Sequence, residues 1–350
     1  MKDPRPKKTR DYPDAEMQPK PLNVCDSAAE QMTFWDLPET RFDFVPVPGT
    51  VAKKSQGQAK PFVKWAGGKG QLLELLDGML PSDFSTRKDL VYVEPFVGGG
   101  AMLFHILSKY PNVRKAVIND LNTDLITCYR VIKERPEELI SALKDFHAQY
   151  RALKSEEKRR RLFLDKRDRY NSHPADKVET AAIFIFLNRT CFNGLYRVNS
   201  KGQYNVPFGK AVNPLICDEA TIRADSEALK KVEVLCGDFE RVANFISPAA
   251  FFYFDPPYRP LTQTSAFTAY SKHGFGDEQQ IRLANFTKRL AKAGNQWLLS
   301  NSDPHNTNEC DNFFDDLFSG FNIQRVDAMR IINSKADKRG KITELLIRNY

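Results

Sequence analysis

The chain has 350 residues, 41% hydrophobic and 27% charged, a balance typical of a globular protein with a packed core. No stretch approaches the roughly 18 apolar residues of a membrane span, and no signal sequence follows the basic start, so we expect a soluble cytoplasmic protein without membrane contact. The net charge of +8 favours a polyanionic partner such as nucleic acid. The six cysteines form no C-x-x-C pair, which favours reduced thiols and implies no metal.

Residues 1–58 differ in composition from the rest of the chain. They are rich in proline, contain two lysine pairs, and show little periodic apolar pattern. We expect a mostly disordered extension, either a solvated tail or a basic arm that contacts DNA, with the solvated tail the simpler interpretation.

Two glycine-rich segments follow, and each leads into a predicted helix. Residues 61–70 contain Trp65 and Lys69 and precede an apolar helix. The free backbone N–H groups at the start of this helix, together with Lys69, could hold an anion; an ordinary turn is the alternative. A buried strand over 90–93 runs through Glu94 into three glycines, 98–100, and a second strand over 116–118 ends near Asp120. An acid about 20 residues past such a loop is typical of a nucleotide-binding α/β unit, where it binds a ribose.

The middle of the chain, 122–189, is predicted to be helical and includes a basic run over 151–170, read as a solvated helix face or a phosphate contact. Residues 188–210 then predict a hairpin that turns over 200–202. Its Arg, Asn, Lys and aromatic side chains suit base edges, stacking and phosphates, although a plain surface hairpin is the alternative.

The last third of the chain predicts strands over 232–239, 251–254, 296–302 and 343–350, with a helix over 277–292. Together with the earlier elements, this alternation predicts an α/β fold: a Rossmann-like, doubly wound sheet with helices on both faces. The most informative stretch is Asp255-Pro256-Pro257-Tyr258, which follows four bulky apolar residues. A carboxylate, a proline carbonyl and an aromatic ring at a strand end suit a flat ring with an exocyclic amine, such as adenine; a simple turn is the alternative.

Four motifs occur in an order that resembles one family. They are the segments 64–69 (KWAGGK), 94–100 (EPFVGGG), 192–197 with 207–209 (FNGLYR and PFG), and 255–258 (DPPY). The chain resembles the Dam-like, D12 class DNA adenine-N6 methyltransferases over about residues 61–350. The resemblance implies a SAM-binding catalytic domain of residues 59–125 and 225–350, and an inserted, mainly helical target-recognition domain of residues 126–224 that carries the hairpin.

The resemblance also implies roles for individual residues. S-adenosylmethionine would be bound by Trp65, Lys69, Glu94, Phe96, Gly98, Gly100, Asp120, Asp238, Phe239 and Asp255. Catalysis would rest on Asp255, Pro256, Pro257 and Tyr258. Double-stranded DNA, with GATC as the site, would be contacted by Lys64, Arg189, Phe192, Asn193, Leu195, Arg197, Asn199, Lys201 and Tyr204. The expected enzyme acts as a monomer at the nucleoid. It is either an orphan or phage enzyme or the companion of a cognate restriction endonuclease.

The expected reaction is direct attack by N6 of a flipped adenine, without a covalent intermediate. The lone pair of N6 is delocalised into the ring. The Asp255 carboxylate and the Pro256 carbonyl would accept the N6 hydrogens and so localise this lone pair. Methylation of cytosine N4 poses the same chemical problem and is one alternative. A DNA-binding regulator on a methyltransferase scaffold is another, and a nicotinamide-dependent dehydrogenase fits less well because the glycine loop lacks the G-x-G-x-x-G spacing.

Overall fold

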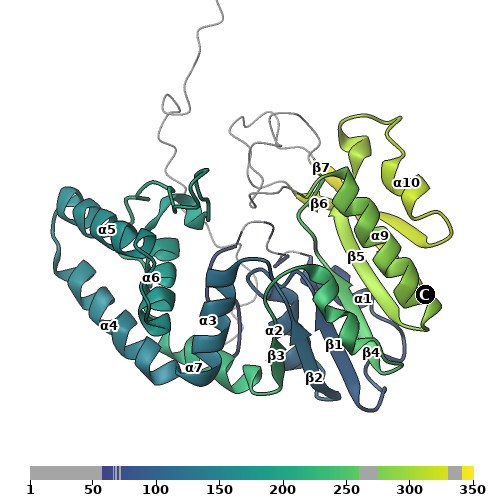
Figure 1. The fold of residues 1–350 in the computed structure, drawn as a ribbon, viewed down its shortest axis with the longest axis horizontal. Coiled ribbons are helices and arrows are strands. Elements are labelled where there is room, and N and C mark those ends of the chain that lie inside the picture. Colours follow the sequence, from purple (N-terminus) through teal and green to yellow (C-terminus); the bar gives the residue numbers. More distant parts are fainter. Residues whose placement is uncertain (1–56, 66, 68, 71, 260–274, 330–340) are drawn as a thin grey trace, which may run out of the picture. The chain divides into compact units, whose positions relative to one another are not determined.

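A computed structural model describes residues 57–65, 67, 69–70, 72–259, 275–329 and 341–350 (Figure 1). The expected extension of residues 1–58 lies outside these ranges, apart from its last two residues. The helices are α1 (Leu73–Gly78), α2 (Ala101–Lys109), α3 (Thr123–Glu134), α4 (Pro136–Ala152), α5 (Glu156–Asn171), α6 (Lys177–Thr190), α7 (Glu219–Leu229), α9 (Asp277–Lys292) and α10 (Phe313–Leu317), with short 3₁₀ turns η1 (Phe192–Gly194), η2 (Phe239–Phe245) and η3 (Pro304–Asn306). Within the described ranges, none of the helices could cross a bilayer.

Seven strands form one sheet in the order β3-β2-β1-β4-β5-β7-β6. They are β1 (Leu90–Glu94), β2 (Val113–Ile118), β3 (Val232–Val234), β4 (Ala250–Phe254), β5 (Gln296–Ser302), β6 (Asn322–Met329) and β7 (Lys341–Arg348). The pairs among β1 to β5 are parallel, whereas β7 is antiparallel to both β5 and β6. The chain moves outward from β1 to β3 and then returns to β4 beside β1, so ligands are expected at the carboxyl ends of β1 and β4.

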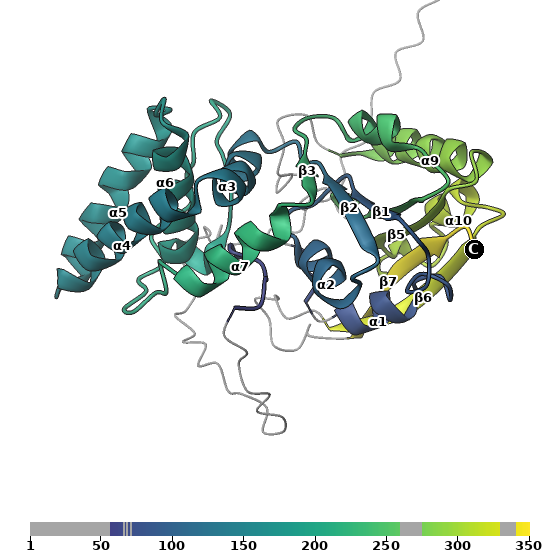
Figure 2. The ribbon, with the colours of Figure 1, turned by 90° about the horizontal axis from the view of Figure 1, so that it is seen from below.

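Strand β4 shows why the sheet is covered on both faces. All five of its residues are buried. Because successive side chains point to opposite faces, Phe251 and Tyr253 join the core that contains α1 and α2, while Phe252 and Phe254 join the core that contains α9 and α10. The two helix pairs lie on opposite sides of the sheet in Figure 2. The predicted doubly wound α/β fold is confirmed.

Helices α4, α5 and α6 lie together to one side of the sheet (Figures 1 and 2). In α6, every residue over 180–188 is buried, as expected for a helix that is apolar all round. In α5, by contrast, only Phe163 and Tyr170 are buried, so most of the basic run over 151–170 faces solvent. The limits of the target-recognition domain, 126–224, stay a prediction.

Two elements differ from their predicted form. Strand β6 was not predicted, because it is an edge strand whose described side chains are mostly exposed and give little apolar signal. The predicted hairpin reverses as expected, since the Asn199 amide donates to the Gln203 carbonyl at 2.8 Å. However, its arms meet only in single bridges, Val198 with Tyr204 and Cys191 with Phe208, and not in continuous strands.

Candidate functional site

The carboxyl end of β4 places Asp255 beside a buried lysine. Lys69 Nζ lies 2.8 Å from Asp255 Oδ1, and the lysine side chain is only 6% exposed. Ser300, on the neighbouring strand β5, donates its hydroxyl to the same oxygen at 3.0 Å. These two donors hold one oxygen of the carboxylate in place, and the predicted Lys69 and Asp255 motifs therefore meet in one site.

Tyr258 is fixed by the same group of side chains. Lys69 Nζ lies 4.4 Å from the centre of its ring, and its hydroxyl donates to Glu344 Oε2 at 2.6 Å. Burial, followed by the charges of Asp255 and Glu344, raises the pKa of Tyr258 well above its ordinary value, so the phenol stays a donor. Glu344 lies on β7 and was not among the predicted site residues, because a glutamate within a strand carries no motif.

The glycine loop after β1 is held against Asp120. The Gly98 amide donates to Asp120 Oδ2 at 3.0 Å, and the Asn122 amide donates to Oδ1 at 2.9 Å. Gly100 has φ +77°, and a Cβ there would lie 2.5 Å from the Tyr129 hydroxyl oxygen. Each carboxylate oxygen of Asp120 keeps a further lone pair, which suits the two hydroxyl groups of a ribose.

Glu94 ends strand β1, and Phe96 lies between it and the glycine loop. Glu94 is buried and accepts the Tyr92 hydroxyl at 2.8 Å. Burial raises the pKa of Glu94 well above its ordinary value, and the nearby charges of Asp255 and Asp120 add to the effect. The ring of Phe96 lies 5.5 Å from that of Phe239, so two of the predicted cofactor residues are in aromatic contact.

Asp238 is held differently from Asp120. It caps η2 through the Glu240 amide, and its carboxylate pairs with Arg282 at 2.6 Å. The guanidinium of Arg282 also lies 4.6 Å from the centre of the Phe239 ring. Asp238 therefore sits beside Phe239, as the motif order predicts, but with a cationic partner that the sequence does not reveal.

Trp65 lies between the glycine loop and the recognition segment. A Cβ on Gly98 would come within 2.8 Å of Trp65 Cδ1, so the loop and the indole are in close contact. The ring of Tyr196 also stacks on Trp65, with a centroid distance of 5.6 Å. Two motifs that are far apart in the sequence are thus in direct contact.

The buried side chain of Asn188 joins the same two segments through hydrogen bonds to main-chain groups. Its Oδ1 accepts the Lys64 amide at 2.8 Å, and its Nδ2 donates to the carbonyls of Lys64 at 2.8 Å and Gly194 at 2.9 Å. Gly194 has φ +66°, and a Cβ there would collide with the Lys64 side chain. The tight turn after Phe192 therefore needs glycine at this position.

Several predicted DNA contacts are available at the surface. Phe192 is 43% exposed, and the residues Lys64, Asn193, Arg197 and Lys201 are exposed as well, while Leu195 is partly buried. Asn193 adopts the left-handed conformation with φ +53°. Arg197 Nε donates to Asn205 Oδ1 at 2.8 Å, which holds the guanidinium across the turn.

Three other predicted contacts make hydrogen bonds to main-chain groups of the protein itself. Tyr204 is only 3% exposed and donates its hydroxyl to the Leu195 carbonyl at 3.2 Å. Arg189 donates to the Phe62 carbonyl at 2.7 Å, and Asn199 Oδ1 accepts the amides of Lys201 and Gln203. Polar and aromatic residues that support a turn have the same composition as residues that read bases, and the burial of Tyr204 fits the supporting role. The DNA contacts of Arg189, Asn199 and Tyr204 stay a prediction.

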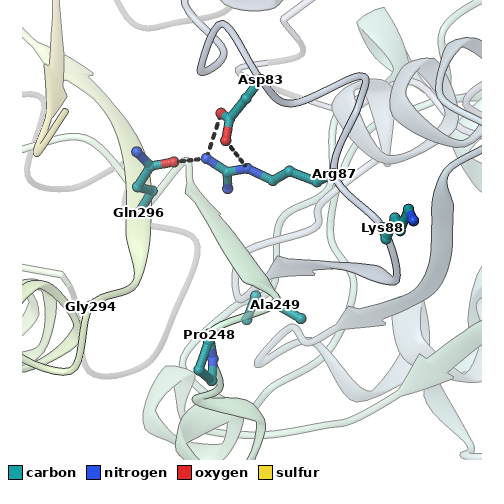
Figure 3. Close-up of a pocket in the computed structure, with 8 residues that line it drawn as sticks. Asp83, Arg87, Lys88, Pro248, Ala249, Gly294 and Gln296 are labelled. Carbon is teal, nitrogen blue, oxygen red and sulfur yellow. Dashed lines mark hydrogen bonds and ion pairs between the residues drawn. The ribbon is translucent and has the colours of Figure 1, made fainter.

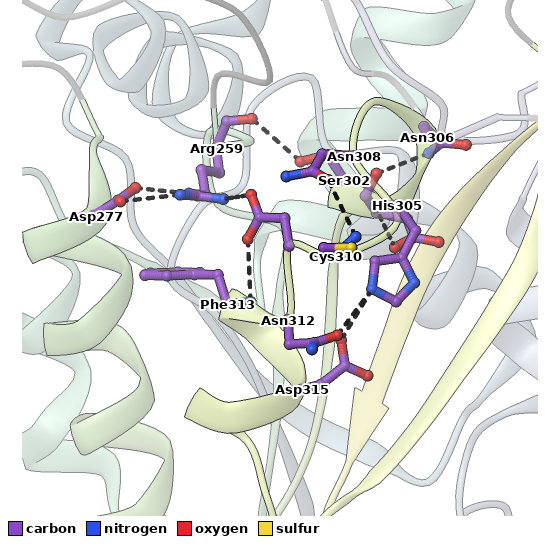
Figure 4. A network of polar contacts seen from close by, with 12 residues as sticks. Arg259, Asp277, Ser302, His305, Asn306, Asn308, Cys310, Asn312, Phe313 and Asp315 are labelled. Carbon is purple, nitrogen blue, oxygen red and sulfur yellow. Dashed lines mark hydrogen bonds and ion pairs between the residues drawn. The ribbon is translucent and has the colours of Figure 1, made fainter.

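The chain after Tyr258 is tied down by Arg259, a residue that sequence reasoning did not single out (Figure 4). Its guanidinium pairs with Asp277 at 2.7 Å and with Asp311 at 2.6 Å, and it lies 4.2 Å from the centre of the Phe313 ring. The Ser302 hydroxyl also donates to the Arg259 carbonyl at 3.2 Å. These contacts fix the outgoing end of the segment that carries Asp255.

A cavity of about 420 Å³ lies at the opposite, amino ends of the strands (Figure 3). Its lining includes Pro248, Ala249 and Gln296, next to the starts of β4 and β5. Arg87 in this lining already pairs with Asp83 and Gln296. None of the predicted site residues lines it, so it is separate from the Asp255 site.

Known proteins resemble this chain over most of its length. Residues 65–332 match the family model for D12 class N6 adenine-specific DNA methyltransferases. The chain is 48% identical to the Type II methyltransferase M.MjaIII of Methanocaldococcus jannaschii, over 84% of this chain and 100% of that protein. It is 40% identical to the Type II methyltransferase M1.LlaDCHI of Lactococcus lactis subsp. cremoris, over 85% and 98% of the two chains.

The DNA adenine methylase of Escherichia coli (strain K12) is 32% identical, over 82% of this chain and 94% of that one. These matches confirm the family resemblance and favour an adenine-methylating enzyme over cytosine-N4 chemistry, a regulator and a dehydrogenase. The chain belongs to the D12 class of N6 adenine-specific DNA methyltransferases.

Proposed function

We propose that the enzyme binds S-adenosylmethionine across the ends of β1 and β4 and methylates N6 of an adenine flipped out of duplex DNA at GATC. The observation that carries the proposal is the Asp255 carboxylate at the end of β4, held by Lys69 and Ser300 beside the ring of Tyr258. Carboxylate, proline carbonyl and aromatic ring together match the donors and the flat face of adenine.

The described residues fit the cofactor. Asp120 retains acceptors for ribose hydroxyls beside the glycine loop. The partly buried ring of Phe96, backed by the buried ring of Phe239, would face an adenine ring, and the carboxylate of Asp255 favours a cationic group nearby. S-adenosylmethionine would supply an electrophilic methyl group on a positively charged sulfur. We assign its binding to the ten residues named from the family motifs, with Asp238 acting together with Arg282.

Asp255 and Pro256 would activate the target base. Because N6 is conjugated with the ring, its lone pair must be localised before it can act as a nucleophile. The Asp255 carboxylate and the Pro256 carbonyl would accept the two N6 hydrogens, and Tyr258 would stack on the ring. No covalent bond between the protein and adenine is needed.

The exposed residues beside the turn would read and open the duplex. The exposed ring of Phe192 would insert beside the flipped base. This contact would offset the cost of a few kcal/mol for unstacking the adenine from the duplex. Arg197 has the fork geometry for a guanine edge, and residues 193–197 resemble those of GATC-modifying members of the family. Lys64 and Lys201 would meet phosphates. We further propose a monomer on DNA and, as the Type II names of two relatives suggest, a cognate restriction endonuclease.

Substitution of Asp255 tests this proposal. In Asp255→Asn the carboxylate becomes an amide, so single-turnover methyl transfer to a GATC duplex should fall on the order of 100-fold or more. Binding of labelled duplex should persist, because the exposed recognition residues are unchanged. Asp168→Asn, at an exposed carboxylate on α5, is the matched control and should transfer at the unaltered rate. Near-normal transfer by Asp255→Asn would exclude the role given to this carboxylate.

A further inference from the structure

The carboxylate of Glu344 contacts two groups of the reaction centre without belonging to any of the predicted motifs. Its Oε2 accepts the Tyr258 hydroxyl at 2.6 Å and lies 4.0 Å from Lys69 Nζ. The Glu344 side chain is only 15% exposed. A charged group so placed is costly unless it is paired, and both of its partners are side chains of the site.

The backbone of Glu344 is held on both sides by the sheet. In the register of β7, Glu344 lies opposite Ser302 of β5 and opposite Val326 of β6. Tyr258, in contrast, belongs to the loop after β4, and the proline before it has no N–H to donate. The Tyr258–Glu344 hydrogen bond therefore anchors a loop residue to a rigid part of the fold.

Glu344 also alters the charge balance around Asp255. Lys69 pairs closely with Asp255, at 2.8 Å, and more distantly with Glu344, at 4.0 Å. Two carboxylates thus share one ammonium group, which leaves one negative charge without a partner among these three side chains. An Asp255 carboxylate that is only partly neutralised is a better acceptor for the hydrogens of an amine.

We propose that Glu344 is a positioning residue for methyl transfer. It holds the ring plane of Tyr258 for the target adenine and keeps the carboxylate of Asp255 available by sharing Lys69. This inference rests on the proposed function, in which residues 255–258 receive the flipped base.

A double-mutant cycle of Tyr258→Phe and Glu344→Ala tests the proposal. Each change removes the same charge-assisted hydrogen bond, so each should lower the single-turnover rate about 10-fold to 100-fold. The double variant should be little slower than Glu344→Ala alone, because the shared bond is lost only once. Fluorescence of 2-aminopurine at the target position should rise in each variant, since a loosely held ring stacks less well on the flipped base. Additive losses in the cycle, or unchanged fluorescence, would overturn the proposal.

Glu344→Gln separates positioning from folding. Glutamine has the same shape as glutamate and keeps an acceptor oxygen for Tyr258. The single-turnover rate of Glu344→Gln should therefore be closer to that of the unaltered enzyme than the rate of Glu344→Ala is. If Glu344→Ala fails to fold, the cycle is run with Glu344→Gln, whose rate should then depend less on Tyr258→Phe; equal dependence would contradict the proposal. Asp255→Asn separates a failure of the proposed function from a failure of the role of Glu344. Full activity of Asp255→Asn overturns the proposed function, whereas an inactive Asp255→Asn together with additive losses in the double-mutant cycle overturns only the role of Glu344.

Discussion

Asn188→Ala should weaken both the fold and DNA binding, because one side chain joins the Lys64 segment to the recognition turn. Asn188 is 4% exposed and makes three hydrogen bonds to main-chain groups, two at Lys64 and one at Gly194. Alanine can replace none of them. The Lys64 amide and two carbonyls would lose their partner inside the protein.

The size of the effect follows from these three bonds. A buried hydrogen bond contributes about 1 kcal/mol net, so the free energy of unfolding should fall by about 3 kcal/mol. It should fall further if the main-chain groups stay away from water. DNA affinity should also decrease, because the turn that presents Phe192 and Asn193 would no longer be tied to Lys64.

Urea denaturation and duplex binding measure the two effects of Asn188→Ala. Asn322→Ala, at an exposed position on the edge strand β6, serves as the control and should change the free energy of unfolding by less than about 0.5 kcal/mol. A loss below about 1 kcal/mol for Asn188→Ala would refute the reasoning, since it would mean that water replaces all three partners without cost.

Three further changes probe separate parts of the structure. Gly100→Ala should lower the free energy of unfolding by about 1–3 kcal/mol in urea denaturation and weaken cofactor binding in calorimetry, because alanine is strained at φ +77° and its Cβ would meet the Tyr129 hydroxyl; unchanged values for both would contradict the close approach. Burial, with a contribution from the charge of Asp218, raises the pKa of Asp225 from 3.8 to about 8. The protonated Asp225 carboxyl therefore makes its whole contribution to the free energy of unfolding below pH 3.8, and this contribution is lost as the pH rises to about 8. Asp225→Asn should thus gain stability relative to the unaltered protein between pH 5 and 8; parallel pH profiles of the two proteins would exclude the shift. Arg197→Ala should reduce discrimination at one guanine by about 1–3 kcal/mol, measured as kcat/KM on GATC and substituted duplexes, whereas an equal loss on all duplexes would indicate a phosphate contact.

The sequence predicts strand β4, helix α9 and the Lys69–Asp255 contact well. Strand β4 has four bulky side chains after Ala250, and two prolines follow Asp255, so the local sequence predicts both the burial and the end of the strand. The predicted bounds of helix α9 match the structure, because its apolar residues recur with helical spacing between Gly276 and Gly294. Lys69 and Asp255, which motifs assign to one site, lie in contact.

Other features depend on tertiary contacts that no local pattern records. Glu344 and Arg259 reach the site because β7 inserts between β5 and β6 and because Asp277 and Asp311 converge on one guanidinium. Tyr204 has the composition of a DNA contact, yet its ring packs against Tyr196 in the interior. Residue type alone does not show whether a polar aromatic side chain faces a partner or supports the loop above it.

Product analysis of a single defined substrate tests the central claim most directly. The enzyme is incubated with S-adenosylmethionine that carries a labelled methyl group and with a duplex containing one GATC, and the nucleosides are then identified by mass spectrometry. We expect labelled N6-methyladenine from this duplex, and none from a matched duplex in which the guanine of the site is replaced. Label on cytosine, or equal labelling of both duplexes, would contradict adenine-N6 transfer at GATC.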